Sequence, residues 1–336
     1  MPVDIAIGHD GTPYITAYPW SAGFGAKYAN PSTLPGGNGR SVAFSPSNLD
    51  IAVGNTGSPY ITAYPWIPGF GTKYANPSTL PPGQGEGVAF SPDGADIAVA
   101  HPYSPFVTAY PWSAGFGTKY ADPSTLPASH SDDVAFSPSG SDIAIGHDGT
   151  PYITAYPWSA GFGTKYANPS TLPPAECWSV DFSPDGADIA VGHAGSPYVS
   201  AYPWSAGFGT KYGNPSTLPP YTGFDVAFSP SGYDIGVAHG YSPFVSAYPW
   251  SAGFGAKYAN PSTLPTSHSW GVAFSPTSAD IAVGHEGSPY ITAYPWGGGF
   301  GAKYADPSTL PASIGRSPFF TFAVGKIDHL PLMGLG

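Results

Sequence analysis

Histidine is the first residue type with possible chemistry, because it recurs at one position of a unit that repeats every 46 residues. Six of the seven units have it, and Asn55 takes its place in the remaining one. Such a ring of imidazoles could bind a metal ion or respond to pH. The alternative is a structural role at a strand end, which we favour because no H-x3-H pair occurs. We therefore expect no metal site. The histidines are His9, His101, His147, His193, His239 and His285.

Aspartate and lysine also keep the period of the repeat. Each aspartate begins a predicted strand, and each lysine lies later in the same unit. We interpret them as structural or solvated charges, with an ion pair in each unit as one form of this. An exposed pair would stabilise the fold by at most about 1 kcal/mol. The aspartates are Asp4, Asp50, Asp96, Asp142, Asp188, Asp234 and Asp280. The lysines are Lys27, Lys73, Lys119, Lys165, Lys211, Lys257 and Lys303.

Motifs of known catalytic sites are missing from the sequence. We find no G-x-S-x-G, phosphate-binding loop, H-E-x-x-H or paired cysteines, and Cys177 is the single cysteine. The recurring Gly-Phe-Gly is too short to hold a phosphate. An enzyme is expected to have a unique nucleophile and base. We therefore predict no enzyme, no catalytic residue and no cofactor.

Variation between units is concentrated in two connections, which in a propeller emerge on the same face. Neutral change in loops is one explanation, and a binding face with different contacts from each unit is the other. Aromatic and arginine side chains are typical of such contacts. The candidate ligand-binding residues are Arg40, Glu86, Tyr103, His130, Asp132, Trp178, Tyr221, Phe224, Tyr241, His268, Trp270 and Arg316.

The elements that must position these residues follow from the repeat. The segment A-Y-P-W ends at Trp20 and returns every 46 residues as far as Trp296. In the unit that includes Trp112, the pattern predicts four short strands, separated by turns with Gly and Pro. The predicted strands are 88–90, 96–100, 106–110 and 116–120. Four short strands in a unit of this length are typical of a propeller blade.

The two ends of the chain complement each other. The first unit begins at its second strand, and segment 316–320 lies six periods after segment 40–44. Segment 316–320 can therefore supply the missing strand and remove an open sheet edge. We predict an all-β chain in which residues 1–324 form a single seven-bladed β-propeller with four-stranded blades. In this fold the C-terminal strand joins the N-terminal strands and closes the ring.

Segment 88–99, V-A-F-S-P-D-G-A-D-I-A-V, resembles a unit of the WD-repeat propeller family. The resemblance extends over the chain to about Val324. Tyr110 and Pro111 stand where that family has Trp-Asp, and the pair Gly8-His9 follows a strand that it would precede in the family. The resemblance implies a propeller that acts as a non-catalytic platform.

Charge and hydropathy exclude two classes of partner. The net charge is −11, and two of the ten basic residues are arginine, without a basic cluster. We therefore expect no binding of nucleic acid and none to an anionic membrane surface. No apolar run reaches the roughly 20 residues of a membrane helix, so we expect no membrane insertion. The first residues, Met1 to Asp4, do not form a signal peptide.

These observations favour a non-catalytic binding or structural module in an extracellular or virion-associated assembly, with a protein as partner. The alternative is a multivalent lectin with one weak glycan site in each unit. A third hypothesis, an enzyme with its site at the mouth of the channel, is not favoured. Glycan-array binding would separate the first two hypotheses, and a screen for turnover would test the third.

Segment 325–336 is apolar and surplus to the ring. It either folds back on its own propeller or docks on a second copy, which would produce a homo-oligomer or a filament. The candidate self-association residues are Ile327, Leu330, Leu332, Met333 and Leu335.

Overall fold

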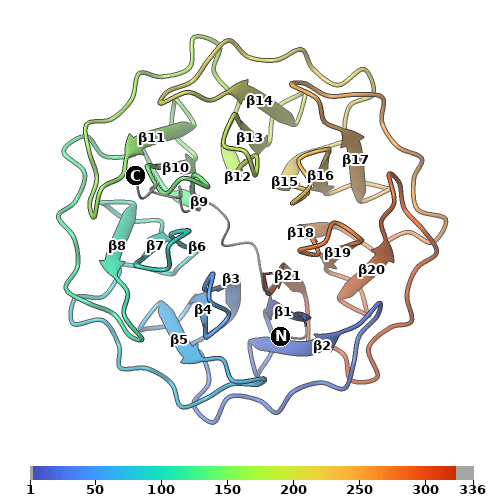
Figure 1. Cartoon of the computed structure of the whole chain (residues 1–336), viewed down its shortest axis with the longest axis horizontal. Helices are drawn as coiled ribbons and strands as arrows, with labels where there is room; N and C mark the ends of the chain where they lie inside the picture. The colour runs from blue at the N-terminus through green and yellow to red at the C-terminus, as the bar shows by residue number, and fades with distance from the viewer. Residues whose placement is uncertain (1–2, 323–336) are drawn as a thin grey trace, which may run out of the picture.

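The computed structural model describes residues 3–322, in which 21 strands form seven antiparallel sheets of three strands each. The sheets are arranged as blades around a central opening (Figure 1). This all-β arrangement is consistent with the seven-bladed β-propeller that the repeat predicts. Residues 325–336, with the five self-association candidates, lie outside the described residues. Within residues 3–322, no helix is long and apolar enough to cross a membrane.

Each blade has an inner, a middle and an outer strand, named by distance from the centre of Figure 1. The inner strands are β3 (Gly39–Phe44), β6 (Gly87–Phe90), β9 (Ser131–Phe136), β12 (Cys177–Phe182), β15 (Gly223–Phe228), β18 (Ser269–Phe274) and β21 (Gly315–Phe320). The middle strands are β1 (Val3–His9), β4 (Asp50–Asn55), β7 (Asp96–Ala100), β10 (Asp142–His147), β13 (Asp188–His193), β16 (Asp234–His239) and β19 (Asp280–His285). The outer strands are β2 (Ile15–Trp20), β5 (Ile61–Pro65), β8 (Val107–Pro111), β11 (Ile153–Pro157), β14 (Val199–Pro203), β17 (Val245–Pro249) and β20 (Ile291–Pro295).

The prediction of a fourth strand in each blade is wrong. In the blade that contains β8, the following segment forms one isolated bridge, between Trp112 and Phe116. Gly117 then donates its backbone N–H to the carbonyl of Pro111 at 2.8 Å. Proline has no N–H to donate in return, and the next bond, from the Tyr120 N–H to the Ala109 carbonyl at 2.9 Å, is isolated from it, so no continuous ladder forms. Every outer strand has a proline at this position at or near its end, and each of the seven sheets has three strands.

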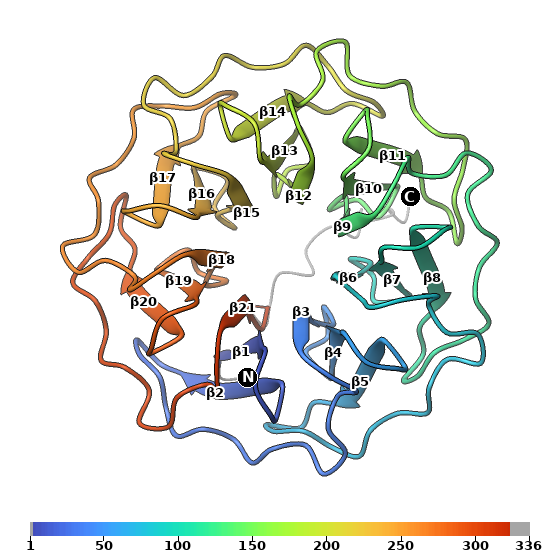
Figure 2. The same cartoon turned by 180° about the vertical axis from the view of Figure 1, so that it is seen from behind.

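The first and last described strands belong to one sheet, with strand order β2-β1-β21. β21 pairs antiparallel with β1, and Phe320 lies opposite Ile5. Thr321 adds a backbone hydrogen bond to the carbonyl of Asp4 at 2.9 Å. Figures 1 and 2 show β21 beside β1 from the two sides of the molecule. The C-terminal strand thus pairs with the N-terminal strand in one sheet.

The hydrophobic core consists of seven similar clusters, each between two neighbouring blades. One of them joins Ile61 and Ala63 of one blade to Ile97, Val99 and Trp112 of the next. Both faces of every sheet are covered in this way, so the middle strands are buried along most of their length. The strict period therefore has a physical cause, because every blade must fit the same pair of neighbours.

The repeated aspartates connect neighbouring blades. Asp96 accepts hydrogen bonds from the Tyr120 hydroxyl of its own blade at 2.6 Å and from Trp158 Nε1 of the next blade at 2.9 Å. The equivalent bond from Trp20 to Asp280, at 2.9 Å, joins the first and last blades. The aspartates therefore have a structural role as buried hydrogen-bond acceptors, and the ion pair with lysine that we considered is not their interaction.

Replacing Asp96 by Ala is expected to lower the free energy of unfolding by about 2–4 kcal/mol. The change leaves the Tyr120 hydroxyl and the Trp158 indole N–H buried without an acceptor, and each such group costs about 1–3 kcal/mol. Urea unfolding followed by tryptophan fluorescence measures the loss. Asp122→Asn is the control, because this exposed position is Asn in five of the seven units. Equal stability of the two variants would show that these bonds contribute nothing.

The repeated histidines are buried as well. His101 Nε2 lies 2.8 Å from the Thr108 hydroxyl of the outer strand, and His285 makes the same contact with Thr292. Burial lowers the pKa of each of these two imidazoles to about 4. They are therefore neutral near pH 7 and act as hydrogen-bonding groups of the blade. This favours the structural interpretation of the histidine ring over a metal site or a pH switch.

Candidate active site at the mouth of the central channel

One repeat position is the second residue of six inner strands and the residue just before β6, and it holds five different residue types in the seven blades. Because the inner strands surround the central opening (Figure 1), their first residues lie around one mouth of the channel. All seven side chains at this position line one cavity of about 410 Å³. They are Arg40, Glu86, Asp132, Trp178, Phe224, Trp270 and Arg316. The variation that the sequence shows is thus gathered at a single site.

Eight of the twelve predicted ligand-binding residues line this cavity, since His130 joins the seven above. The other four lie outside it. Tyr221 and Tyr241 form an exposed pair with ring centroids 4.5 Å apart, and the centroid of the His268 ring is 6.2 Å from that of Tyr241. Tyr103 is exposed in a turn of another blade. The predicted set therefore divides into a cavity and a few surface residues.

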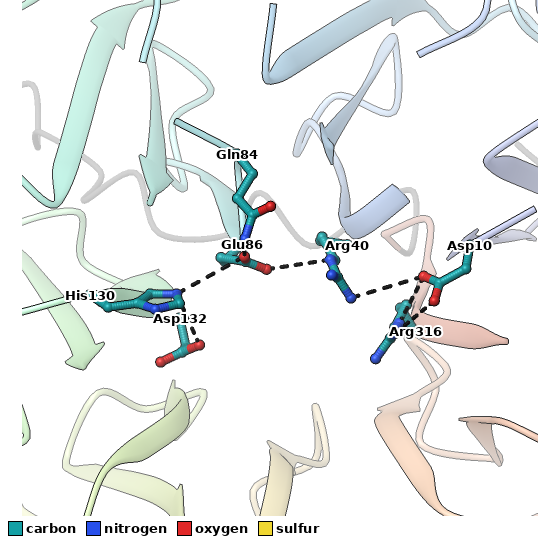
Figure 3. Close-up of polar contacts among 7 residues, drawn as sticks. All are labelled: Asp10, Arg40, Gln84, Glu86, His130, Asp132 and Arg316. Atoms are coloured by element: carbon teal, nitrogen blue, oxygen red, sulfur yellow. Dashed lines mark hydrogen bonds and ion pairs between the residues drawn. The ribbon is translucent and has the colours of Figure 1, made fainter. Parts of the chain in front are cut away.

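Charged side chains form one side of the cavity (Figure 3). Arg316 donates two hydrogen bonds to Asp10, from Nε at 3.0 Å and from Nη2 at 2.7 Å. The guanidinium of Arg40 lies 3.9 Å from Asp10 and 3.6 Å from Glu86, distances of ion pairs rather than hydrogen bonds. Gln84 donates its side-chain amide to Glu86. The turn residue Asp10 was not among the candidates from the sequence.

His130 is surrounded by carboxyl groups. Its Nε2 lies 3.5 Å from Asp132 and 4.0 Å from Glu86, and its Nδ1 lies 3.5 Å from Asp148. Burial, followed by the nearby carboxylates of Asp148 and Glu86, raises the pKa of Asp132 to about 9. Asp132 is therefore a protonated acid at neutral pH. The site combines an imidazole with a neutral carboxylic acid within a few ångströms.

Aromatic side chains form the other side of the cavity. The ring centroids of Trp178 and Phe224 are 5.5 Å apart, and those of Phe224 and Trp270 are 4.4 Å apart. Trp270 also packs under Arg316, whose guanidinium carbon is 4.4 Å from the ring centre, and donates its indole N–H to Glu286 at 3.1 Å. Such an aromatic wall can cover the apolar face of a sugar ring.

Several polar atoms in this cavity are buried without a hydrogen-bond partner among residues 3–322. They are Arg40 Nε, His130 Nε2, Asp132 Oδ2, Trp178 Nε1 and Ser179 Oγ. Buried polar atoms are nearly always paired in native proteins, because an unpaired one costs about 1–3 kcal/mol. Five of the ten such side-chain atoms among residues 3–322 therefore belong to the lining of this one cavity, and they come from three different blades.

Three further aspartates, Asp133, Asp181 and Asp225, belong to inner strands, and the first and last of them also line this cavity. Each accepts a backbone N–H from the next inner strand. The donors are Val180 at 3.0 Å, Phe228 at 2.7 Å and Val272 at 2.8 Å. Burial raises the pKa of Asp133 and Asp181 to about 7. In the part of the chain that the structure describes, no group of three or more His, Cys, Asp or Glu side chains is arranged to hold a metal ion.

The raised pKa of Asp132 predicts how stability depends on pH. In the unfolded chain an aspartate loses its proton near pH 4. The folded protein retains this proton up to pH about 9. The folded state therefore binds more protons between these values, and this group makes stability fall as the pH rises from about 4 to 9.

Asp132→Asn is accordingly expected to raise the free energy of unfolding at pH 8 by on the order of a few kcal/mol, and to change it little at pH 4. Urea unfolding at the two pH values measures this difference. Asp306→Asn, an exposed change of the same charge, is the control and is expected to have no such pH dependence. A variant less stable than the original chain at pH 8 would contradict the raised pKa.

No protein-family model and no curated protein matches the chain. The fold, however, is similar to those of solved structures. The periplasmic gluconolactonase PpgL of Pseudomonas aeruginosa superimposes with a TM-score of 0.70 at 15% identity, covering 96% of this chain and 99% of its own. A candidate 6-phosphogluconolactonase of Bacteroides fragilis has a TM-score of 0.72 at 14% identity, with 95% and 98% covered. A protein of Lactobacillus plantarum has a TM-score of 0.71 at 16% identity, with 95% and 99% covered.

These comparisons correct the functional prediction. The expected non-catalytic module, its lectin alternative and the prediction of no enzyme are contradicted, because several of the structures with this fold are named as lactonases. The comparisons also show no WD-repeat family. The sequence misled because its resemblance was to a family of binding platforms. At these identities, the likeness establishes that the chain has the fold of those lactonase-named propellers.

Proposed function

We propose that this protein is a hydrolase of sugar lactones, with its active site in the cavity at the channel mouth. The observation that carries the proposal is the pair His130 and Asp132, whose Nε2 and Oδ2 atoms are buried in the cavity without a hydrogen-bond partner among residues 3–322. An imidazole and a protonated carboxyl, with Arg40 nearby, provide what ester hydrolysis requires. The names of the structural neighbours supply the substrate class.

In this proposal His130 is the general base. Asp148, 3.5 Å from Nδ1, orients the imidazole and stabilises its positive charge. Nε2 then takes a proton from a water molecule as its oxygen forms a bond to the lactone carbonyl carbon. The carboxylates of Asp148 and Glu86 lie 3.5 and 4.0 Å from the two ring nitrogens and face the imidazolium that results.

Arg40 and Asp132 complete the reaction. The Nε of Arg40 faces Glu86 at 3.6 Å without a hydrogen bond among residues 3–322, so this charge-compensated guanidinium still has an N–H to donate to the oxyanion that forms on the carbonyl oxygen. Asp132 donates its proton to the ring oxygen when the bond between that oxygen and the carbonyl carbon breaks. The two proton transfers involve the water oxygen and the ring oxygen. Both oxygens are bonded to the same carbonyl carbon, which is why acid and base must be close. The imidazolium then returns a proton to Asp132 across 3.5 Å.

The aromatic wall of Trp178, Phe224 and Trp270 positions the substrate. A sugar ring packed against these side chains would present its carbonyl to the charged side of the cavity. The unpartnered indole N–H of Trp178 can donate to a substrate hydroxyl. The two sides of the cavity differ because one repeat position carries aromatic residues in three successive blades and ionisable residues in the other four.

We also propose that the pairing of β21 with β1 closes the ring and thereby assembles this site. Arg316 follows the first residue of β21, and its partner Asp10 follows β1 from the opposite end of the chain. The charged side of the cavity thus depends on contact between the two ends. Loss of this pairing would remove Arg316 and leave Asp10 without its two hydrogen bonds.

The test is acid release from D-glucono-1,5-lactone, followed with a pH indicator and corrected for spontaneous hydrolysis. The purified chain is expected to accelerate the reaction in proportion to its concentration and to show saturation with substrate. A simpler lactone without hydroxyl groups serves as the comparison, because it lacks the groups that Trp178 would bind. A rate equal to the spontaneous rate for both lactones would overturn the proposed function.

A further inference from the structure

Both guanidinium groups of the cavity are already neutralised by the protein. Arg316 makes two hydrogen bonds to Asp10, at 3.0 and 2.7 Å. Arg40 lies between two carboxylates, 3.6 Å from Glu86 and 3.9 Å from Asp10. Arg316 is also covered on one face by Trp270. Neither cation is therefore available as an uncompensated charge for an anionic substrate.

The other ionisable groups around the cavity are acidic or neutral. Asp148, in the turn that follows β10, lies 3.5 Å from His130 Nδ1. Asp133 and Asp225 line the cavity. The seven lysines of the described chain do not line the cavity, since each donates to an Asn or Asp of its own unit or to a neighbouring carbonyl. The charges at the mouth therefore sum to about zero or less.

A phosphate group would fit this environment poorly. It carries about −1.5 to −2 charges at pH 7 and is usually held by several free Arg or Lys donors or by a helix N-terminus. Residues 3–322 contain no helix. To bind phosphate, Arg316 would have to leave Asp10 and expose that carboxylate to a second anion. Like charges at such a distance disfavour binding.

We infer that the substrate is an uncharged sugar lactone, and that Asp10 excludes phosphorylated or carboxylated lactones by binding Arg316 and by compensating, together with Glu86, the charge of Arg40. This inference rests on the proposed function and specifies it. It also separates this chain from those structural neighbours whose names refer to a phosphorylated substrate. Asp10 is thus a specificity-determining residue that acts through the guanidinium groups.

The experiment compares kcat/KM for D-glucono-1,5-lactone and for its 6-phosphate, with the full-length protein. The unphosphorylated lactone is expected to be favoured by at least about 10-fold. Inorganic phosphate at millimolar concentration is expected not to inhibit its hydrolysis. Equal values, or preference for the phosphate ester, would overturn the inference while leaving the proposed function intact. Hydrolysis of neither lactone would instead remove the proposed function, and the inference with it.

Asp10→Asn tests the proposed cause. The amide keeps one acceptor for Arg316 and removes one negative charge, so the variant is expected to fold. Its preference for the unphosphorylated lactone is expected to fall by about 10-fold or more, and inorganic phosphate is expected to become an inhibitor. Asp306→Asn is the matched control, because it removes the same charge at an exposed position remote from the cavity. Unchanged selectivity in folded Asp10→Asn, or an equal change in the control, would refute the role of Asp10.

Discussion

His130→Ala is expected to lower kcat for lactone hydrolysis by about 10²–10⁴-fold, with a smaller effect on KM. The substitution removes the proposed base, whereas Trp178, Phe224 and Trp270 are expected to bind the sugar ring as before. Measurement of initial rates across a range of lactone concentrations separates the two parameters. Circular dichroism and the unfolding midpoint establish that the variant retains the fold.

The repeat supplies a matched control for this substitution. His268 stands at the same repeat position as His130, three units later, but lies outside the cavity. His268→Ala is expected to leave kcat and KM within about twofold of the original values. A similar loss in both variants would indicate a general effect of histidine on the fold, and full activity of His130→Ala would exclude His130 as the base.

Removal of residues 316–336 is expected to abolish cooperative unfolding. It takes away most of β21, including Phe320, which packs with Ile5, Ile7 and Trp20 in the cluster between the first and last blades. Loss of one buried phenylalanine alone costs about 3–5 kcal/mol. The edge of β1 that pairs with β21 also loses its backbone hydrogen bonds. Together these losses approach the whole stability of a typical domain, about 5–15 kcal/mol.

The control is a chain that ends at Phe322 and so keeps β21 intact. It is expected to unfold in one transition close to that of the full chain. Thermal unfolding followed by tryptophan fluorescence and by circular dichroism measures both variants, and coincident curves indicate cooperativity. A chain without residues 316–336 that melts as the full chain does would show that pairing of β21 with β1 is not needed to hold the ring.

Much of the fold follows from the sequence because each blade repeats one local pattern. The period gives seven units, and the alternation of Ile97 and Val99 indicates a buried strand. The register of segment 316–320 also predicts its pairing with β1. The prediction of a fourth strand failed for a local reason. Pro111 lacks a backbone N–H, and this weakens pairing only along the edge of the strand that the N–H would face. A pattern of apolar residues does not contain that information.

The contacts between blades could not be predicted in the same way. Trp158 donates to Asp96, which is 62 residues earlier, and no local pattern relates them. Arg316 and Asp10 are 306 residues apart in the chain and form one bidentate pair. The sequence did identify Arg40, Glu86 and Arg316 as candidates, because they differ within an otherwise constant unit. The pairing of the two arginines with Asp10, a turn residue of the first unit, depends on the arrangement of the blades in a ring.

The sequence by itself determined the repeated blade and the positions at which the blades differ. Only the tertiary structure decided that eight of these varied residues line one cavity and that Asp132 is a neutral acid beside His130. The reason is physical. A contiguous motif places its groups through local backbone geometry, whereas this cavity receives residues from all seven blades, and their distances exist only when the blades surround a common axis. The pKa of Asp132 likewise depends on carboxylates that arrive from Glu86 and Asp148, on either side of it in the chain.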